Sequence, residues 1–168
     1  LLEEVKFAVI RGNISEIKTV SKGSGTTKGV DADVSDAVTE KNLDETISFA
    51  KELSAKTNAV IAISGAIDIV TDASKAYIIR NGHPMMAKIT GTGCMLTAVI
   101  AAYCAANPEN HLDATAAAVS AFGLAGEIAY DKLVKTDGGN ASYRTYLIDA
   151  VSKIDAEAIK GGAKIEIR

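Results

Sequence analysis

Short apolar runs alternate with helical patterns over the first half of the chain. The unbroken run 59–63 is typical of a strand covered on both faces, and 7–10 reads as a shorter strand. Apolar residues at helical spacing predict one helix through residues 14–20 and another over 43–56. At the second helix, Asn42 and Glu45 have the spacing of a capping box. A loop at 22–28 and a hairpin formed by strands 68–71 and 75–80 complete this half.

Alanine-rich helical stretches dominate the second half. The segment 93–106 is apolar on nearly every side, which predicts a buried helix that Asn107-Pro108 ends. Two further helices are predicted over 113–135 and 143–152, and residues 164–167 could close the sheet as an edge strand. Strands that alternate with helices and then give way to a helical half predict one α/β domain over residues 1–168.

Composition and charge narrow the class of protein. Of the 168 residues 48% are hydrophobic, which predicts a well-buried core, and the net charge of −3 with scattered basic residues favours neither nucleic acid nor an anionic membrane as a partner. Cys94 and Cys104 lie about 15 Å apart along one predicted helix and cannot pair there. We find no signal segment, zinc motif or membrane-spanning stretch, so we expect a cytoplasmic protein. The opening residues indicate an N-terminal truncation.

Two glycines and a cysteine open the apolar segment, in the run Thr90-Gly91-Thr92-Gly93-Cys94. The first N–H groups of a helix lack intrahelical partners and carry the positive end of the helix dipole, so this position suits a phosphate. Without a Cβ, Gly91 and Gly93 allow a close approach to those amides. The same dipole favours the thiolate form of Cys94. A simple turn before a core helix explains the pattern equally well.

Four ordered motifs together resemble hydroxyethylthiazole kinase: Val9-Ile10-Arg11-Gly12-Asn13-x-x-Glu16, Ile61-Ala62-Ile63-Ser64-Gly65, Asn81-Gly82-His83 and Thr90-Gly91-Thr92-Gly93-Cys94. The cysteine in the last motif, where the wider superfamily has aspartate, is its most specific feature. The resemblance implies a ribokinase-like fold, in which helices flank a mostly parallel central sheet, and indicates that the N-terminal part of that fold is missing here. It also implies a homotrimer with active sites between subunits.

The resemblance further implies ATP-dependent, magnesium-assisted phosphorylation of the hydroxyl of 4-methyl-5-(2-hydroxyethyl)thiazole, a step of thiamine salvage. Cys94 matches the position of the catalytic base, and the amides from Gly91 to Cys94, with Gly93 among them, would hold the moving phosphoryl group. By the same match Arg11 and Ser64 would contact ATP, Gly91 would touch the thiazole, and Glu16 would help to hold magnesium.

Several of these residues also have plainer explanations. Asn13 and Glu16 have capping-box spacing, as Asn42 and Glu45 do, so spacing alone does not separate a helix cap from a magnesium site. Ser64 could simply end a strand, and Arg11 could be a solvated side chain. We assign no catalytic role to His83 or His111, and we expect Lys88 to be an exposed lysine.

Other functions stay open at this point. Within the same superfamily the alternatives are a pyridoxal or hydroxymethylpyrimidine kinase, or a nucleotide-dependent hydrate dehydratase. Outside enzymes, a catalytically silent nucleotide-binding module would keep the glycine-rich anion site without turnover. The sequence has neither a G-x-x-x-x-G-K-[ST] loop nor a complete dinucleotide fingerprint, so P-loop and oxidoreductase functions are disfavoured.

Overall fold

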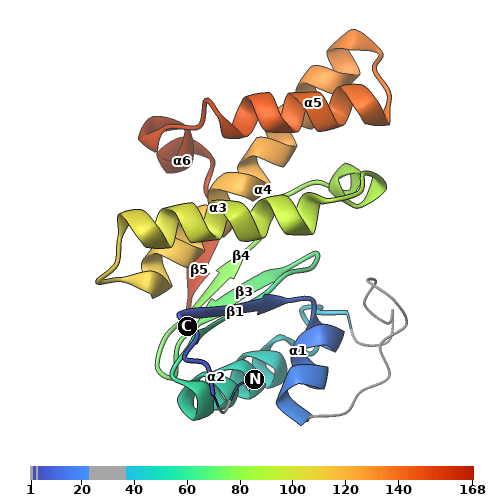
Figure 1. Cartoon of the computed structure of the whole chain (residues 1–168). Helices are drawn as coiled ribbons and strands as arrows, with labels where there is room; N and C mark the ends of the chain where they lie inside the picture. Colours follow the sequence, from blue (N-terminus) through green and yellow to red (C-terminus); the bar gives the residue numbers. More distant parts are fainter. Residues whose placement is uncertain (1, 3, 23–36) are drawn as a thin grey trace.

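The computed structural model describes residues 2, 4–22 and 37–168 (Figure 1). In this part of the chain one five-stranded sheet has the order β1-β2-β3-β4-β5. Its strands are β1 (Val9–Gly12), β2 (Val60–Ile63), β3 (Asp68–Thr71), β4 (Ala76–Ile79) and β5 (Ile165–Ile167). Strand β2 is apolar and buried throughout, as expected for a sheet covered on both faces.

Helices cover the two faces of the sheet unequally. On one face lie α1 (Ile14–Lys22) and α2 (Leu43–Thr57). The other face carries a thicker layer, with α3 (Thr92–Ala106), α4 (His111–Thr136) and α5 (Asn140–Val151) (Figure 1). A 3-10 helix, η2 (Pro84–Lys88), leads from the sheet into α3, and α6 (Ala156–Gly162) leads back to β5. This arrangement confirms the α/β class.

The described sheet is mixed rather than mostly parallel. Only β1 and β2 pair in parallel, with Val9 opposite Val60, whereas β2–β3, β3–β4 and β4–β5 are antiparallel. The expectation of a mostly parallel sheet is therefore wrong for this part of the chain. Parallel pairing needs a long crossover, which the segment between β1 and β2 supplies, while the short links between β2, β3 and β4 permit only hairpins.

Alternating side chains divide the sheet between two hydrophobic cores. Ile61, Ile63, Ile69 and Ile78 face α1 and α2, and their neighbours in sequence, such as Ala62 and Val70, face α3 and α4. In the described residues α4 is the one helix long and apolar enough to cross a membrane, a property that the sequence pattern did not reveal. Because 78% of its most apolar stretch is buried against protein, α4 is accounted for as a core helix.

Most predicted elements occur within a few residues of their expected bounds. The first strand begins two residues later than predicted, so Arg11 and Gly12 belong to β1. The hairpin is confirmed, and its turn is fixed by Asp72, whose Oδ1 accepts hydrogen bonds from the backbone N–H groups of Ser74 and Lys75. The pattern missed α6. Apart from Lys22, which ends α1, the predicted loop at 22–28 lies outside the described residues.

One predicted capping box does not form. Asn42 stands at the N-cap of α2, but its side chain makes no capping hydrogen bond. Its Oδ1 instead accepts from the backbone N–H of Thr39, and its Nδ2 donates to the carbonyl of Ala37. The residues before α2 therefore compete successfully for the side chain that the sequence pattern assigns to the helix.

Candidate active site

The carboxyl ends of three strands meet at one edge of the sheet. Strands β1, β2 and β4 run in the same direction and end there, and the antiparallel strand β3 begins there. In α/β proteins this edge is where ligands bind. A cavity of about 1020 Å³ opens at it, bounded on the far side by η2 and the start of α3. In Figure 1 the first turn of α3 lies over this end of β1.

All six residues predicted for the site line this one cavity. They come from β1, from α1, from the end of β2 and from the first turn of α3, and they are Arg11, Glu16, Ser64, Gly91, Gly93 and Cys94. The structure therefore brings together residues that are up to 83 positions apart in the sequence. What each of them does there depends on the local geometry.

Arg11 reaches from β1 across the end of β2 to the start of α3. Its Nη2 donates a 2.6 Å hydrogen bond to Oγ of Ser64. A Cβ added to Gly93 would lie 3.0 Å from Nη1 and 3.3 Å from Nη2. The missing side chain of Gly93 therefore makes the room that the guanidinium occupies. Among the described residues, the buried Nε of Arg11 has no hydrogen-bond partner.

The first turn of α3 adds a second positive group. Gly91 caps the helix with φ of +95°, a left-handed conformation that favours glycine, and the first backbone bond of the helix runs from Met95 N to Gly91 O. The N–H groups of Thr92, Gly93 and Cys94 consequently lack intrahelical acceptors. A helix N-terminus and a guanidinium of the same sign repel each other, and a bound anion would relieve that repulsion.

Asn13 and Glu16 form the capping box whose spacing the sequence shows. Asn13 N donates to Oε2 of Glu16 at 2.7 Å, and Glu16 N donates to Oδ1 of Asn13 at 2.9 Å. Gly12 permits this geometry, because a Cβ there would lie 3.0 Å from Glu16 Oε2. The plainer explanation of Glu16 as a helix-capping residue is thus correct for one of its carboxylate oxygens.

The other carboxylate oxygen of Glu16 is the one available to a magnesium ion. In the described part of the chain, no group of three or more His, Cys, Asp or Glu side chains could hold a metal. Magnesium, however, is commonly held by one or two carboxylates together with water and substrate phosphates. Glu16 lines the cavity beside Arg11, so the residues present fit such a partial site and no more.

The two cysteines occupy different environments. Cys94 is exposed in the first turn of α3 and lines the cavity, whereas Cys104 is buried in the same helix beside Oγ1 of Thr115, 3.5 Å from its sulfur. Neither forms a disulfide, as the helical spacing predicts. Cys94 is therefore the thiol that a ligand in the cavity can reach.

A polar network holds the cavity wall that follows β4. Asn81 is buried; its Nδ2 donates to the carbonyl of Gly162, and its Oδ1 accepts from Ser120 Oγ and Lys164 N. Gly82, with φ of +127°, donates its N–H to Glu127. These bonds tie the 81–83 turn to α4 and to the start of β5. Sequence reasoning included Asn81 and Gly82 in a family motif but did not find their partners.

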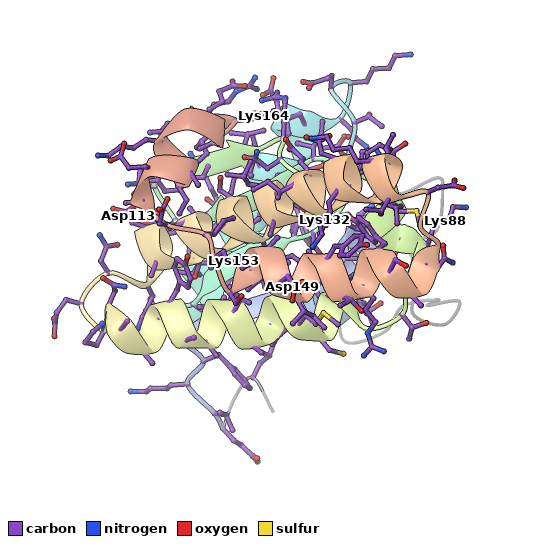
Figure 2. All side chains as sticks on the ribbon, turned by 90° about the horizontal axis from the view of Figure 1, so that it is seen from above. Lys88, Asp113, Lys132, Asp149, Lys153 and Lys164 are labelled. Atoms are coloured by element: carbon purple, nitrogen blue, oxygen red, sulfur yellow. The ribbon has the colours of Figure 1, made fainter. Side chains whose placement is uncertain are left out.

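His83 and Lys88 have structural explanations in this wall. His83 stacks on Tyr130 with ring centroids 3.5 Å apart, and its Nδ1 accepts the N–H of Met85 at the start of η2. Lys88 is exposed at the cavity rim, at one end of the helical layer, while Asp113 lies at the other end (Figure 2). Neither residue needs a catalytic role to account for its position.

Sequence reasoning overlooked an acidic residue in the cavity. Asp68, the first residue of β3, accepts the N–H of Gly65 at 2.8 Å through Oδ1. Burial raises the pKa of its carboxyl to about 7, against the lowering effects of the Gly65 N–H and of the nearby Arg11. The available signal was an acidic residue placed at the start of a short strand, close in the sequence to the end of β2.

Comparison with known proteins agrees with this architecture. Residues 1–157 match the family model described as the hydroxyethylthiazole kinase family. The chain belongs to the hydroxyethylthiazole kinase family. This confirms the resemblance that the four motifs carry.

Individual members of the hydroxyethylthiazole kinase family resemble the chain along nearly its whole length. A protein of Clostridium acetobutylicum named hydroxyethylthiazole kinase is 59% identical over 166 residues, which are 99% of this chain and 60% of that protein. One of the same name from Clostridium tetani is 46% identical over 98% of this chain and 58% of its own length. The chain therefore spans about three-fifths of the length of these relatives.

A solved structure supports the fold assignment independently. The hydroxyethylthiazole kinase protein of Pyrococcus horikoshii OT3 superimposes with a TM-score of 0.76 at 28% identity, and the match covers 95% of this chain and 54% of that one. The sheet and helices described above thus correspond to part of a hydroxyethylthiazole kinase fold.

Proposed function

We propose that the protein containing this chain transfers the γ-phosphoryl group of ATP to the hydroxyl of 4-methyl-5-(2-hydroxyethyl)thiazole. The proposal rests on one observation: the Arg11 guanidinium lies at the N-terminus of α3, in the space that a side chain at position 93 would need. Two positive groups face each other there, and a buried guanidinium nitrogen has no partner among the described residues. A phosphate would satisfy both groups, and family membership supports the thiazole as acceptor.

Arg11 and Ser64 would hold the phosphates of ATP. A guanidinium donates in a fixed planar fork that suits phosphate oxygens and keeps its charge at every physiological pH. The 2.6 Å bond from Arg11 to Ser64 orients that fork and leaves Nη1 for a ligand. Ser64 in turn is fixed by the bond from its backbone N–H to the carbonyl of Gly12, 2.9 Å away.

The first turn of α3 would carry out the transfer itself. The acceptor hydroxyl oxygen forms a bond to the γ-phosphorus as the bond to the ADP oxygen breaks, and the amides at Gly93 and Cys94 stabilise the charge on the moving phosphoryl group. Cys94 would accept the hydroxyl proton late in the transfer. Gly91, which has open space around its Cα, lets the thiazole approach the backbone.

Magnesium would be held at one point by Glu16, through the carboxylate oxygen that the capping box leaves available. When bound, the ion supplies positive charge to the phosphates. The helix cap itself keeps Glu16 pointed toward the end of β1, so the same residue serves α1 and the ligand.

We further propose that the protein works as a homotrimer in the cytoplasm, with active sites between subunits. The outer face of α3 supports an additional covering partner, because five of its alanines are exposed: Ala98, Ala101, Ala102, Ala105 and Ala106. Two free cysteines are in keeping with a reducing compartment.

The deciding experiment is an assay of the complete reading frame that contains this chain. ATP-dependent phosphorylation is measured with hydroxyethylthiazole, hydroxymethylpyrimidine and pyridoxal as acceptors. We expect turnover with the thiazole and little with the other two. Equal rates on all three would refute the thiazole assignment, and ATP binding without any phosphorylated product would favour a silent nucleotide-binding module.

Two single cysteine variants test the proposed base in the same assay. We expect Cys94→Ala to lower kcat about 100-fold, the magnitude typical of losing a positioned acid or base, with little change in ATP affinity. Cys104→Ala is the matched control in the same helix; it removes a buried sulfur and should lower stability while keeping kcat. Wild-type turnover in Cys94→Ala would show that Cys94 is not the base.

A further inference from the structure

Asp68 places a carboxyl group inside a cavity that otherwise favours anions. Its neighbours on the cavity wall include Arg11 and Ser64, which the proposed function assigns to ATP. A negative group at this point weakens phosphate binding unless it loses its charge. The surroundings of Asp68 indicate that its carboxyl has a structural purpose and that it can lose its charge.

The first contact fixes a turn. Oδ1 of Asp68 accepts the N–H of Gly65 at 2.8 Å, which closes the link between the end of β2 and the start of β3. Ser64, the residue that binds Arg11, is the immediate neighbour of Gly65 in this link. The carboxyl group therefore holds in place the backbone that presents the Ser64 hydroxyl.

The second interaction is an effect of charge rather than a direct contact. The positive charge that acts on Asp68 is the Arg11 guanidinium of β1, and it lowers the pKa of a carboxyl that burial has raised to about 7. Other titratable groups on the wall of the same cavity come from α1, from the 83–88 segment and from α3, and they are Glu16, His83, Lys88 and Cys94. Around neutral pH the Asp68 carboxyl is thus close to the point where it gains or loses a proton.

We propose, on the basis of the function proposed above, that Asp68 is a positioning residue: its carboxyl holds the 64–65 turn and offsets the charge of Arg11 in the same cavity until the nucleotide phosphates bind Arg11. Once the phosphates contact Arg11, the carboxylate faces negative charge and takes up one proton from the solvent. No bond to the ligand is formed, and the proton is the one species exchanged. Nucleotide binding is therefore coupled to protonation of Asp68.

The test is calorimetric titration of the complete protein with the magnesium complex of ATP, without acceptor, at pH 7 in two buffers of different ionisation enthalpy. The phosphates of this complex are already ionised, so proton uptake reports on the protein. With a pKa of about 7 in the free protein, we expect uptake of about half a proton per site. At pH 5.5, where Asp68 is already protonated, the uptake should nearly vanish.

Two variants separate the functions of the carboxyl group. Asp68→Asn keeps an oxygen for the Gly65 N–H but cannot titrate, so we expect unchanged turn geometry, no proton uptake, and affinity at pH 8 that exceeds the wild-type value. Asp68→Ala removes the acceptor as well as the charge, and we expect about tenfold weaker nucleotide binding than in Asp68→Asn, as for the loss of one positioning hydrogen bond. Asp72→Asn is the matched control, because Asp72 likewise caps a turn of the sheet but lies outside the cavity.

The outcomes decide the two proposals separately. Proton uptake that persists in Asp68→Asn, or is absent from the wild type, overturns the inference about Asp68. The inference is also overturned when Asp68→Ala binds the nucleotide as tightly as Asp68→Asn. Uptake that depends on Asp68, in a protein that phosphorylates none of the acceptors, supports the inference and refutes the proposed reaction. A protein that does not bind the nucleotide at all refutes both.

Discussion

A methyl group at position 93 should weaken nucleotide binding without unfolding the protein. The Cβ of Gly93→Ala would lie 3.0 Å from Nη1 and 3.3 Å from Nη2 of Arg11. The atoms in its way are the far end of a flexible side chain, so the guanidinium moves and the helix stays. That movement breaks or bends the 2.6 Å bond to Ser64 and displaces the group that we propose contacts phosphate.

The expected effects on stability and binding have opposite signs. Alanine is a better helix former than glycine by at most about 1 kcal/mol, so the melting temperature of Gly93→Ala should stay equal or rise by about 2–4 °C. Loss of one well-placed charged contact is worth roughly 1.4 kcal/mol, which corresponds to about a tenfold higher KM for ATP. The two quantities are measured by thermal unfolding and by steady-state kinetics at saturating acceptor.

A second glycine supplies the control. Gly161 lies in α6, has open space where a Cβ would stand, and is outside the cavity, so Gly161→Ala should change the stability alone. The reasoning would be refuted by a KM for ATP in Gly93→Ala that stays within twofold of the wild type. A large drop in melting temperature would also refute it, because the added methyl group would then strain the helix rather than Arg11.

Two further predictions concern acidic residues. Glu16→Gln keeps an oxygen for the Asn13 N–H but loses the charge, so we expect near-native stability and a raised magnesium requirement. The control Asn13→Ala should lower the free energy of urea unfolding by about 1 kcal/mol through the lost cap. An unchanged magnesium dependence in Glu16→Gln would show that Glu16 does not hold the ion. Hydrogen bonds from Tyr77, Lys75 and Asn110 lower the pKa of Asp113 to about 2, so its stabilising effect is complete above its ordinary pKa near 4 and is lost as the pH falls from 4 to 2. As the pH falls over this range, the urea midpoint should fall less steeply in Asp113→Asn than in the wild type. Equal pH dependence of the two midpoints would contradict the role given to Asp113. Nucleotide affinity at pH 7 should not change, since Asp113 lies at the far end of the helical layer from Lys88 at the cavity rim (Figure 2).

Identical spacing in the sequence led to different local structures at two helix starts. Asn13 and Glu16 close a capping box, whereas Asn42, with Glu45 at the same distance, turns its side chain back to Thr39 and Ala37. Spacing shows that a side chain can reach a backbone group. Which partner it takes depends on the competing groups that the rest of the fold places beside it.

The sequence by itself determined the elements whose cause is local. Apolar runs, helical periodicity and turn residues predicted most of the helices and strands, and the ordered motifs predicted the family. Contacts over long sequence distances needed the tertiary structure. Because β3 runs antiparallel to β2, it begins where β1 and β2 end, and this brings Asp68 into the same cavity as Arg11. Likewise, Gly93 reads as an anion-binding glycine in the sequence, but only the packing of α3 over β1 reveals that its missing side chain makes room for a guanidinium.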